Sequence, residues 1–313
     1  MRPTAALATL LLVAACSSSS STKPTTTPTR PVAKQSIEIT PLEGRPSALV
    51  VSGTTLWVAD DERGVVLRLD ATNGRQLGNP IAVTPHPIAI DADATSVWVA
   101  DRGGDLTRID AITAVADPPI SVGGQLTDVL LVAGTVWVAD IETGTLHLLD
   151  EATGARIGDL LSPAGAVRLA STPTTVWLSN LDHTISSVGI ADHALGAPIA
   201  VGNGPIGLAV DDQQVWVANS DDGTIDRVPL AAGSPRAPAI KVGSGPVSVT
   251  IAGDFVWVVN HDAHTATRLA RADGHVVDQA IGLGMTPRDS SIGPAGVWVA
   301  GVDPSAIVLL RPS

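Results

Sequence analysis

The sequence predicts an all-β, seven-bladed propeller with four antiparallel strands per blade, on the basis of one motif that recurs along its 313 residues. The motif is clearest at residues 215–219 (VWVAN), and each of the seven tryptophans lies in a copy of it. Successive tryptophans are 41, 39, 40, 39, 41 and 41 residues apart. A fixed period of about forty residues is typical of proteins in which each repeat forms one supersecondary unit.

Each repeat is expected to form four short strands joined by tight turns. In the unit at residues 204–242, strands are expected at 206–210, 215–219, 224–229 and 239–242. Four antiparallel strands per unit make the blade of a propeller. The strands are almost continuously apolar, as expected where both faces of a sheet pack on neighbouring sheets.

The two ends of the repeat region predict that the ring closes. Residues 36–40 (SIEIT) resemble a fourth strand and precede the first repeat, whereas the last repeat ends after its third strand at residues 307–310. We expect these two segments to pair in one blade. That pairing would join the ends of the ring and remove the exposed sheet edge of an open array.

The N-terminal part divides into a predicted signal peptide at residues 1–15 and a tether rich in Ser, Thr and Pro at 16–35, before the propeller at 36–313. Residues 13–16 (VAAC) resemble the lipobox of bacterial lipoproteins, which implies lipidation at Cys16. The alternative is an ordinary signal peptide with an incidental cysteine. Cys16 is the only cysteine, so no disulfide can form within the chain. We therefore expect an extracytoplasmic protein anchored to the bacterial cell membrane by its lipid.

The charge of the chain argues against nucleic-acid binding. The net charge is -12, and because the first 35 residues carry four basic and no acidic residues, residues 36–313 hold -16. A repeat region with this negative charge repels phosphate backbones and favours cationic or metal-bridged partners. We expect a monomer that meets the membrane through its anchor and binds an envelope protein or a small molecule.

The repeats resemble those of the YVTN/YncE-like and streptogramin-lyase-like seven-bladed propellers, which follow approximately G-P-x-x-I-A-V-D-x-x-x-V-W-V-A-N-x-x-D-G-T-V-x-R-I-D. Residues 204–228 match nearly every position of this pattern, and 245–269 match most of them. The resemblance covers about nine-tenths of the chain and implies the fold more than a function, since fold does not determine function. Streptogramin lyases are understood to use a histidine base, a glutamate and Mg²⁺, but this set cannot be placed here residue by residue.

Residues that recur in every repeat are interpreted first as structural. The tryptophans are expected to pack between blades with their indole N–H groups satisfied, although a ring for ligand stacking is an alternative. Arginines ten or eleven residues after four of the tryptophans are expected to form inter-blade salt bridges or to pack across apolar surface. Three residues after a tryptophan, an aspartate can cap the next turn or contribute to a Ca²⁺ or Mg²⁺ site. The arginines are Arg68, Arg108, Arg227 and Arg268, and the candidate metal ligands are Asp60, Asp101 and Asp140.

Residues that break the repeat are the better candidates for a ligand site. Arg168 stands where other blades have Gly207 and Ala48, and Asp128 and Asp289 occupy the same register. Arg168 is expected either to pair with one of these aspartates or to grip an anionic ligand. The candidate ligand-binding residues are Asp128, Arg168, His261, Asp262, Arg288 and Asp289, and the candidate catalytic residues are His261 and His264. His86 and His183 also depart from the repeat, in turns that precede a first strand or follow a second strand and are expected to open on the same face of the propeller.

The function expected from these features is a binding or scaffold propeller for a protein or envelope ligand. The alternative is a metal-dependent lyase or hydrolase of the streptogramin-lyase type, in which His261 or His264 would act as base. A nucleic-acid reader ranks third because of the charge. The common signatures of nucleotide-binding, hydrolase, zinc-protease and dithiol sites do not occur in the sequence.

Overall fold

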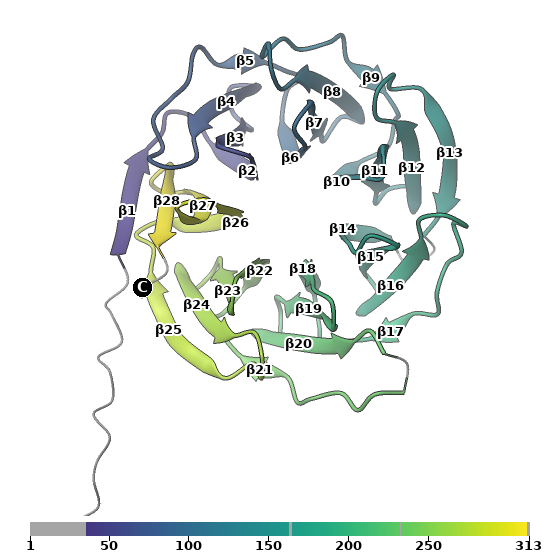
Figure 1. Ribbon diagram of the computed structural model, residues 1–313, viewed down its shortest axis with the longest axis vertical. Coiled ribbons are helices and arrows are strands. Elements are labelled where there is room, and N and C mark those ends of the chain that lie inside the picture. The colour runs from purple at the N-terminus through teal and green to yellow at the C-terminus, as the bar shows by residue number, and fades with distance from the viewer. Residues whose placement is uncertain (1–35, 163–164, 232, 312–313) are drawn as a thin grey trace, which may run out of the picture. The chain divides into compact units, whose positions relative to one another are not determined.

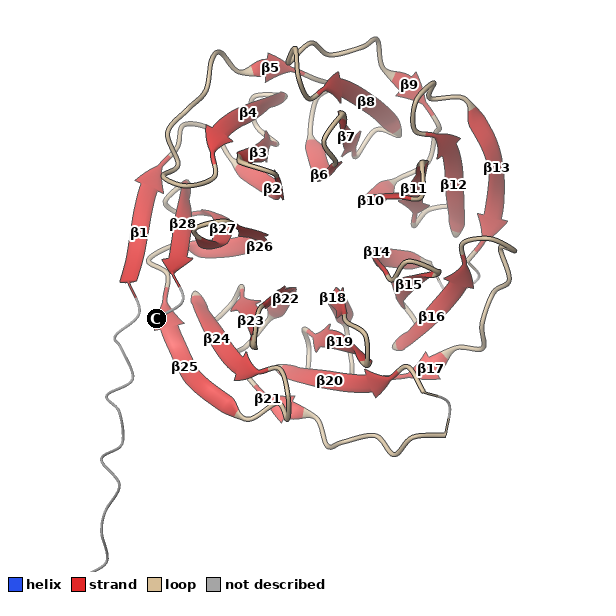
Figure 2. Ribbon diagram, in the orientation of Figure 1, coloured by secondary structure: helices blue, strands red, loops and turns tan. Residues whose placement is uncertain are grey.

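The computed structural model describes residues 36–162, 165–231 and 233–311, and within them the predicted propeller is confirmed (Figure 1). Seven four-stranded antiparallel sheets surround a central axis, and Figure 2 shows only strands and loops in the described part. Among these residues, no helix is long and apolar enough to cross a membrane.

We number the blades by the order of their first, innermost strand. Blade 1 contains β2 (Pro46–Ser52), β3 (Thr55–Asp60), β4 (Val65–Asp70) and β5 (Ile81–Ala82), and blade 2 contains β6 (Pro87–Ala92), β7 (Ser96–Asp101), β8 (Asp105–Asp110) and β9 (Ile120–Ser121). Blade 3 contains β10 (Leu126–Val132), β11 (Thr135–Asp140), β12 (Thr145–Asp150) and β13 (Arg156–Leu161), and blade 4 contains β14 (Ala166–Ser171), β15 (Thr175–Asn180), β16 (Thr184–Gly189) and β17 (Ile199–Ala200). Blade 5 contains β18 (Pro205–Val210), β19 (Gln214–Asn219), β20 (Thr224–Pro229) and β21 (Ile240–Lys241), and blade 6 contains β22 (Pro246–Ala252), β23 (Phe255–Asn260), β24 (Thr265–Ala270) and β25 (Val276–Gly282). Blade 7 contains β26 (Thr286–Gly293), β27 (Gly296–Val302), β28 (Ala306–Arg311) and β1 (Ser36–Pro41).

The N-terminal strand closes the ring, as predicted. β1 pairs with β28 in antiparallel register, from Ser36 opposite Arg311 to Pro41 opposite Ala306. Glu38 also accepts a hydrogen bond of 2.9 Å from Nε of Arg311. Segments from the two ends of the repeat region therefore form the outer half of one sheet (Figure 1), and no blade is left with an open gap to its neighbour.

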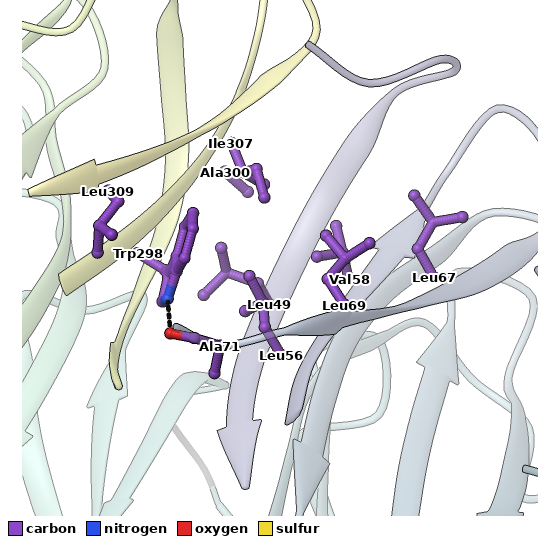
Figure 3. Close-up of a cluster of buried hydrophobic side chains, with 10 residues drawn as sticks. All are labelled: Leu49, Leu56, Val58, Leu67, Leu69, Ala71, Trp298, Ala300, Ile307 and Leu309. Carbon is purple, nitrogen blue, oxygen red and sulfur yellow. Dashed lines mark hydrogen bonds between the residues drawn. The ribbon is translucent and has the colours of Figure 1, made fainter. Parts of the chain in front are cut away.

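Tryptophans on the second strand of each blade form the inter-blade core. Trp298 of blade 7 packs against blade 1, including Leu49 and Leu56, and its Nε1 donates a 2.9 Å hydrogen bond to the carbonyl of Ala71 (Figure 3). All seven tryptophans are buried, which confirms the packing interpretation. The expected satisfaction of every indole N–H was wrong, because three of them have no acceptor among the described residues: those of Trp98, Trp137 and Trp177.

The repeated arginines do not form salt bridges between blades, contrary to one of the two expectations. Arg108 pairs with Asp117 at 2.9 Å, and Arg268 pairs with Asp278 at 2.5 Å, in each case within one blade. Each recurring arginine lies opposite a tryptophan in the register, so its stem lies across an indole. The guanidinium carbon of Arg268, for example, is 5.5 Å from the ring centroid of Trp257. The packed-stem expectation is the one that this geometry matches.

Candidate ligand site at the mouth of the central channel

A β-bulge in the first strand of every blade shapes one mouth of the central channel. In β2 the pairing with β3 shifts between Pro46 and Ala48, so Ser47 has no residue opposite it. The first strands of the other six blades shift at the corresponding position. A bulge re-aims the extra side chain, here toward the channel. The re-aimed residues are Ser47, Ile88, Thr127, Val167, Ile206, Val247 and Arg288, and all seven line a cavity of about 280 Å³.

We call this space the mouth cavity. Its remaining lining residues are Arg102, Gln125, Leu126, Arg168 and His261. Leu126 and Arg168 lie in first strands, and the other three lie in turns that precede a first strand or follow a second strand on the same face of the propeller. Among the described residues, the lining therefore includes three arginines and one histidine and no carboxylate. The local charge is opposite to the net charge of the body, so the expectation of a cationic partner does not fit this surface.

Arg288 is the one charged residue among the seven bulge positions. It is partly buried, and its Nε has no hydrogen-bond partner in the described part of the chain. Burial lowers the pKa of Arg288 and the nearby charge of Arg45 lowers it further, whereas the charge of Asp61 opposes them more strongly than the charge of Arg102 supports them. Arginine ion pairs in the described residues involve other side chains, namely Arg63, Arg108, Arg156, Arg168, Arg236, Arg268, Arg271 and Arg311.

Below the mouth cavity, a second cavity of about 200 Å³ occupies the channel and is lined by the first strands. The predicted common register of Asp128, Arg168 and Asp289 is confirmed, because they pair with Ala139, Ser179 and Ala300 at equivalent positions of the second strands. All three line this channel cavity, and Arg168 also reaches the mouth cavity.

The aspartates of the channel connect neighbouring blades. Oδ2 of Asp128 accepts a 2.7 Å hydrogen bond from the backbone N–H of Leu169, while Oδ1 lies 3.3 Å from Nη1 of Arg168. Oδ2 of Asp289 likewise accepts from the N–H of Leu49, at 3.1 Å. Burial alone would lower the pKa of Arg168, but the charges of Asp128 and Asp289 raise it. Arg168 thus has a carboxylate partner, which favours the ion-pair interpretation over an anion grip by this residue.

Asp91 belongs to the same set, and the sequence analysis missed it. Its Oδ2 accepts a 2.8 Å hydrogen bond from the N–H of Leu131 in the next blade, and its side chain lines the channel. Burial raises the pKa of Asp91 to about 7, and the charge of Asp128 adds to the effect. Asp91 and Ala209 occupy equivalent positions in blades 2 and 5, because each lies opposite the tryptophan of its own blade. An acidic residue at a position that is apolar in another blade is the sequence signal that could have revealed Asp91.

Of the two candidate catalytic histidines, only His261 lines the mouth cavity. Its Nδ1 lies 2.8 Å from Oδ1 of the exposed Asp262. His264 sits in the same turn, and its Nδ1 is 3.5 Å from Oγ1 of Thr286. His86 and His183 contact turns on the same face of the propeller, through Asp61 and the N–H of Gly204, and do not line the mouth cavity.

The candidate metal ligands Asp60, Asp101 and Asp140 lie in three different blades, where each caps the turn after the second strand. Oδ1 of Asp60, for example, accepts hydrogen bonds from the backbone N–H groups of Arg45, Glu62 and Arg63. Nowhere in the described ranges do three His, Cys, Asp or Glu side chains gather in a way that could hold a metal ion. The arginines of the mouth cavity do not fit Mg²⁺ either, since Mg²⁺ takes oxygen ligands.

No protein-family model matches the chain, and a search of curated proteins finds no relative. Several solved structures resemble the chain in fold. A chain of Kuenenia stuttgartiensis hydrazine synthase matches with a TM-score of 0.76 and 14% identity, over 87% of this chain and 97% of that one. A streptogramin B lyase matches with a TM-score of 0.77 and 13% identity, over 90% and 100%. U3-55K matches with a TM-score of 0.72 and 10% identity, over 88% and 98%. At such identities the chain is similar to these proteins in fold alone.

Proposed function

We propose that this chain is a non-enzymatic binding module that takes its ligand at the mouth cavity and works outside the cytoplasm on a lipid anchor. The observation that carries the binding proposal is the ring of bulge residues. All seven blades contribute one re-aimed side chain to a single concavity, and the closed ring of sheets holds their backbones in place. Concave sites on rigid scaffolds, with apolar walls and a few polar groups, are where small ligands bind.

β1 runs from the face opposite the mouth cavity to the face of the mouth cavity. Pro41, at the end of β1, leads into the turn before β2, which lies on the face of the mouth cavity. Because β1 crosses the blade, Ser36 lies toward the opposite face. Cys16, the predicted lipidation site, lies outside the described residues.

The proposal can be tested by blocking the mouth cavity. Ile206→Trp adds a large side chain to the bulge ring, whereas Ile112→Trp adds it to an exposed turn between β8 and β9. A thermal-shift screen of amino acids, dipeptides, sugars and short carboxylic acids should find compounds that stabilise the wild type and Ile112→Trp but not Ile206→Trp. Binding at this cavity would be contradicted if the compounds stabilised Ile206→Trp as much as Ile112→Trp. It would also be contradicted if no compound stabilised any of the three proteins. Circular dichroism of the three proteins controls for folding.

The alternative function is a metal-dependent lyase or hydrolase of the streptogramin-lyase type. His261 favours it, because this side chain lines the mouth cavity and Asp262 lies within hydrogen-bonding distance to orient its ring. The lining residues do not supply the carboxylates that a magnesium-assisted step would need. If a ligand is found that the protein converts, His261→Ala should abolish turnover and leave binding measurable. Under the binding proposal, the ligand is released unchanged by both proteins.

A further inference from the structure

We propose that the mouth cavity binds an oxyanion, either a carboxylate or a phosphate, that is attached to an apolar body, and that Arg288 makes the main contact with the anion. This inference rests on the proposed function and specifies the chemistry of its ligand. It depends on the charge of the cavity, on the depth at which that charge changes sign, and on the distribution of apolar side chains around the ring.

Two arginines of the cavity have no carboxylate partner among the residues that the structure describes. Arg288 and Arg102 line it, and Arg45 lies near enough to disfavour the charged form of Arg288. The buried Nε of Arg288 has no acceptor among the described residues, so this N–H is free to donate to a ligand. A guanidinium offers donors in a planar fork that matches carboxylate and phosphate oxygens. A bound oxyanion would also relieve the repulsion among the three arginines.

The charge changes sign between the mouth and the channel. Asp91, Asp128 and Asp289 line the channel cavity, and the Arg168 guanidinium is already 3.3 Å from Asp128. An anion that enters from the mouth face therefore meets arginines first and carboxylates deeper in. The stable position for its charge is the mouth, beside Arg288, and Arg168 contributes at most a longer-range field.

The bulge ring is asymmetric, which orients the ligand. Blades 7 and 2 supply Arg288 and Arg102 to the lining, and Arg45 of blade 1, which lies between these blades in the ring (Figure 1), is close to Arg288. Blades 4, 5 and 6 supply Val167, Ile206 and Val247 at the bulge positions. A ligand with an anionic end and an apolar end can satisfy both sides at once. A fully polar anion such as inorganic phosphate would leave the apolar side covered only by water, so its binding should be weaker.

Calorimetric titration of the full-length protein can test this inference with three probes of similar shape. Benzoate and phenyl phosphate carry the two oxyanions on one apolar ring, and benzamide is the neutral counterpart of benzoate. The variant Arg288→Gln removes the central guanidinium, and Arg102→Gln removes a more exposed one. Arg75→Gln is the matched control, because Arg75 is an exposed arginine of the turn between β4 and β5, on the opposite face.

We expect benzoate or phenyl phosphate to bind the wild type and the Arg75→Gln control alike, and benzamide to bind at least tenfold more weakly. Arg288→Gln should weaken oxyanion binding at least tenfold, which corresponds to ~1.4 kcal/mol, and Arg102→Gln should weaken it less. The tighter of the two oxyanions identifies the ligand source. Equal binding of benzamide, unchanged binding by Arg288→Gln, or no binding of either oxyanion would overturn the inference. If the oxyanions fail while a neutral compound still binds in a manner that Ile206→Trp blocks, only this inference fails and the proposed function stands.

Discussion

Asp91 offers the most direct test of how the channel carboxylates affect stability. The perturbation is Asp91→Asn, which keeps the size of the side chain and one acceptor oxygen but cannot ionise. In the folded protein Asp91 accepts backbone hydrogen bonds from Leu131 and Ala92, and burial raises its pKa to about 7 from the ordinary 3.8. The charged and polar groups that face it in the channel include Asp128, Arg168 and Asp289.

The sign of the effect follows from proton linkage. Between about pH 4 and pH 7 the folded protein retains a proton on Asp91 that the unfolded chain releases. The stability that protonated Asp91 provides is therefore fully present below the pKa of this carboxyl in the unfolded chain, 3.8. It is lost as the pH rises to about 7. At ~1.36 kcal/mol for each pKa unit, the difference amounts to about 4 kcal/mol. Because the channel is open to water, we expect roughly 2 to 4 kcal/mol.

The assay is urea unfolding of the wild type and Asp91→Asn at several values between pH 4 and pH 8. The free energy of unfolding of Asp91→Asn, relative to the wild type, should rise by the stated amount across this range. Asp110→Asn is the control, since hydrogen bonds from Thr113 lower the pKa of Asp110 and its contribution is constant above about pH 5. A relative stability of Asp91→Asn that does not change with pH would refute the reasoning.

Three further changes test the scaffold. Deletion of residues 36–41 should lower the melting temperature by at least about 5 °C because β28 loses its partner strand, and an unchanged value would contradict the closure of the ring by β1. Trp298→Ala should cost about 3 to 5 kcal/mol in urea unfolding because it leaves a cavity between blades 7 and 1, and a loss below ~1 kcal/mol would contradict that packing role. Gly104→Ala should cost about 1 to 3 kcal/mol, since its φ is +91° and a Cβ would lie 2.7 Å from the backbone of Gly123. Gly53→Ala, at φ +58° with open space around the Cβ, should cost less.

Most of the fold could be predicted because it is encoded locally and then repeated. A motif of five residues recurs seven times, so a strand that is hard to assign in one copy can be assigned from the others. The fourth-strand pattern at residues 36–40 identified the partner of β28. The strand boundaries were less accurate at the outer edge. A strand expected at 239–242 is reduced to Ile240–Lys241, and the outermost strands of blades 1, 2 and 4 are likewise two residues long.

The candidate site was harder to predict because it depends on direction more than on composition. Arg288 was selected as an irregular residue beside Asp289, yet the two adjacent side chains serve different cavities. Asp289 continues the alternation of the strand and reaches the channel, where it binds the N–H of Leu49. Arg288 occupies the bulge, which interrupts that alternation and turns it to the mouth. Alternation along a strand has a period of two residues, so a single inserted residue changes the face of a side chain without leaving a sign in the apolar pattern.

The same distinction separates the net charge of the chain from the charge of the mouth cavity. Charge summed over residues 36–313 describes the whole surface, where most acids cap turns or pair with arginines in their own or a neighbouring blade. Those acids are already satisfied by N–H groups or guanidinium groups, so they offer little to a ligand. Arg102 and Arg288 of the mouth cavity have no carboxylate partner among the described residues, so their guanidinium groups can still bind an anionic ligand. In a repeat protein, therefore, the positions at which one blade departs from the others are more informative about recognition than the composition of the chain.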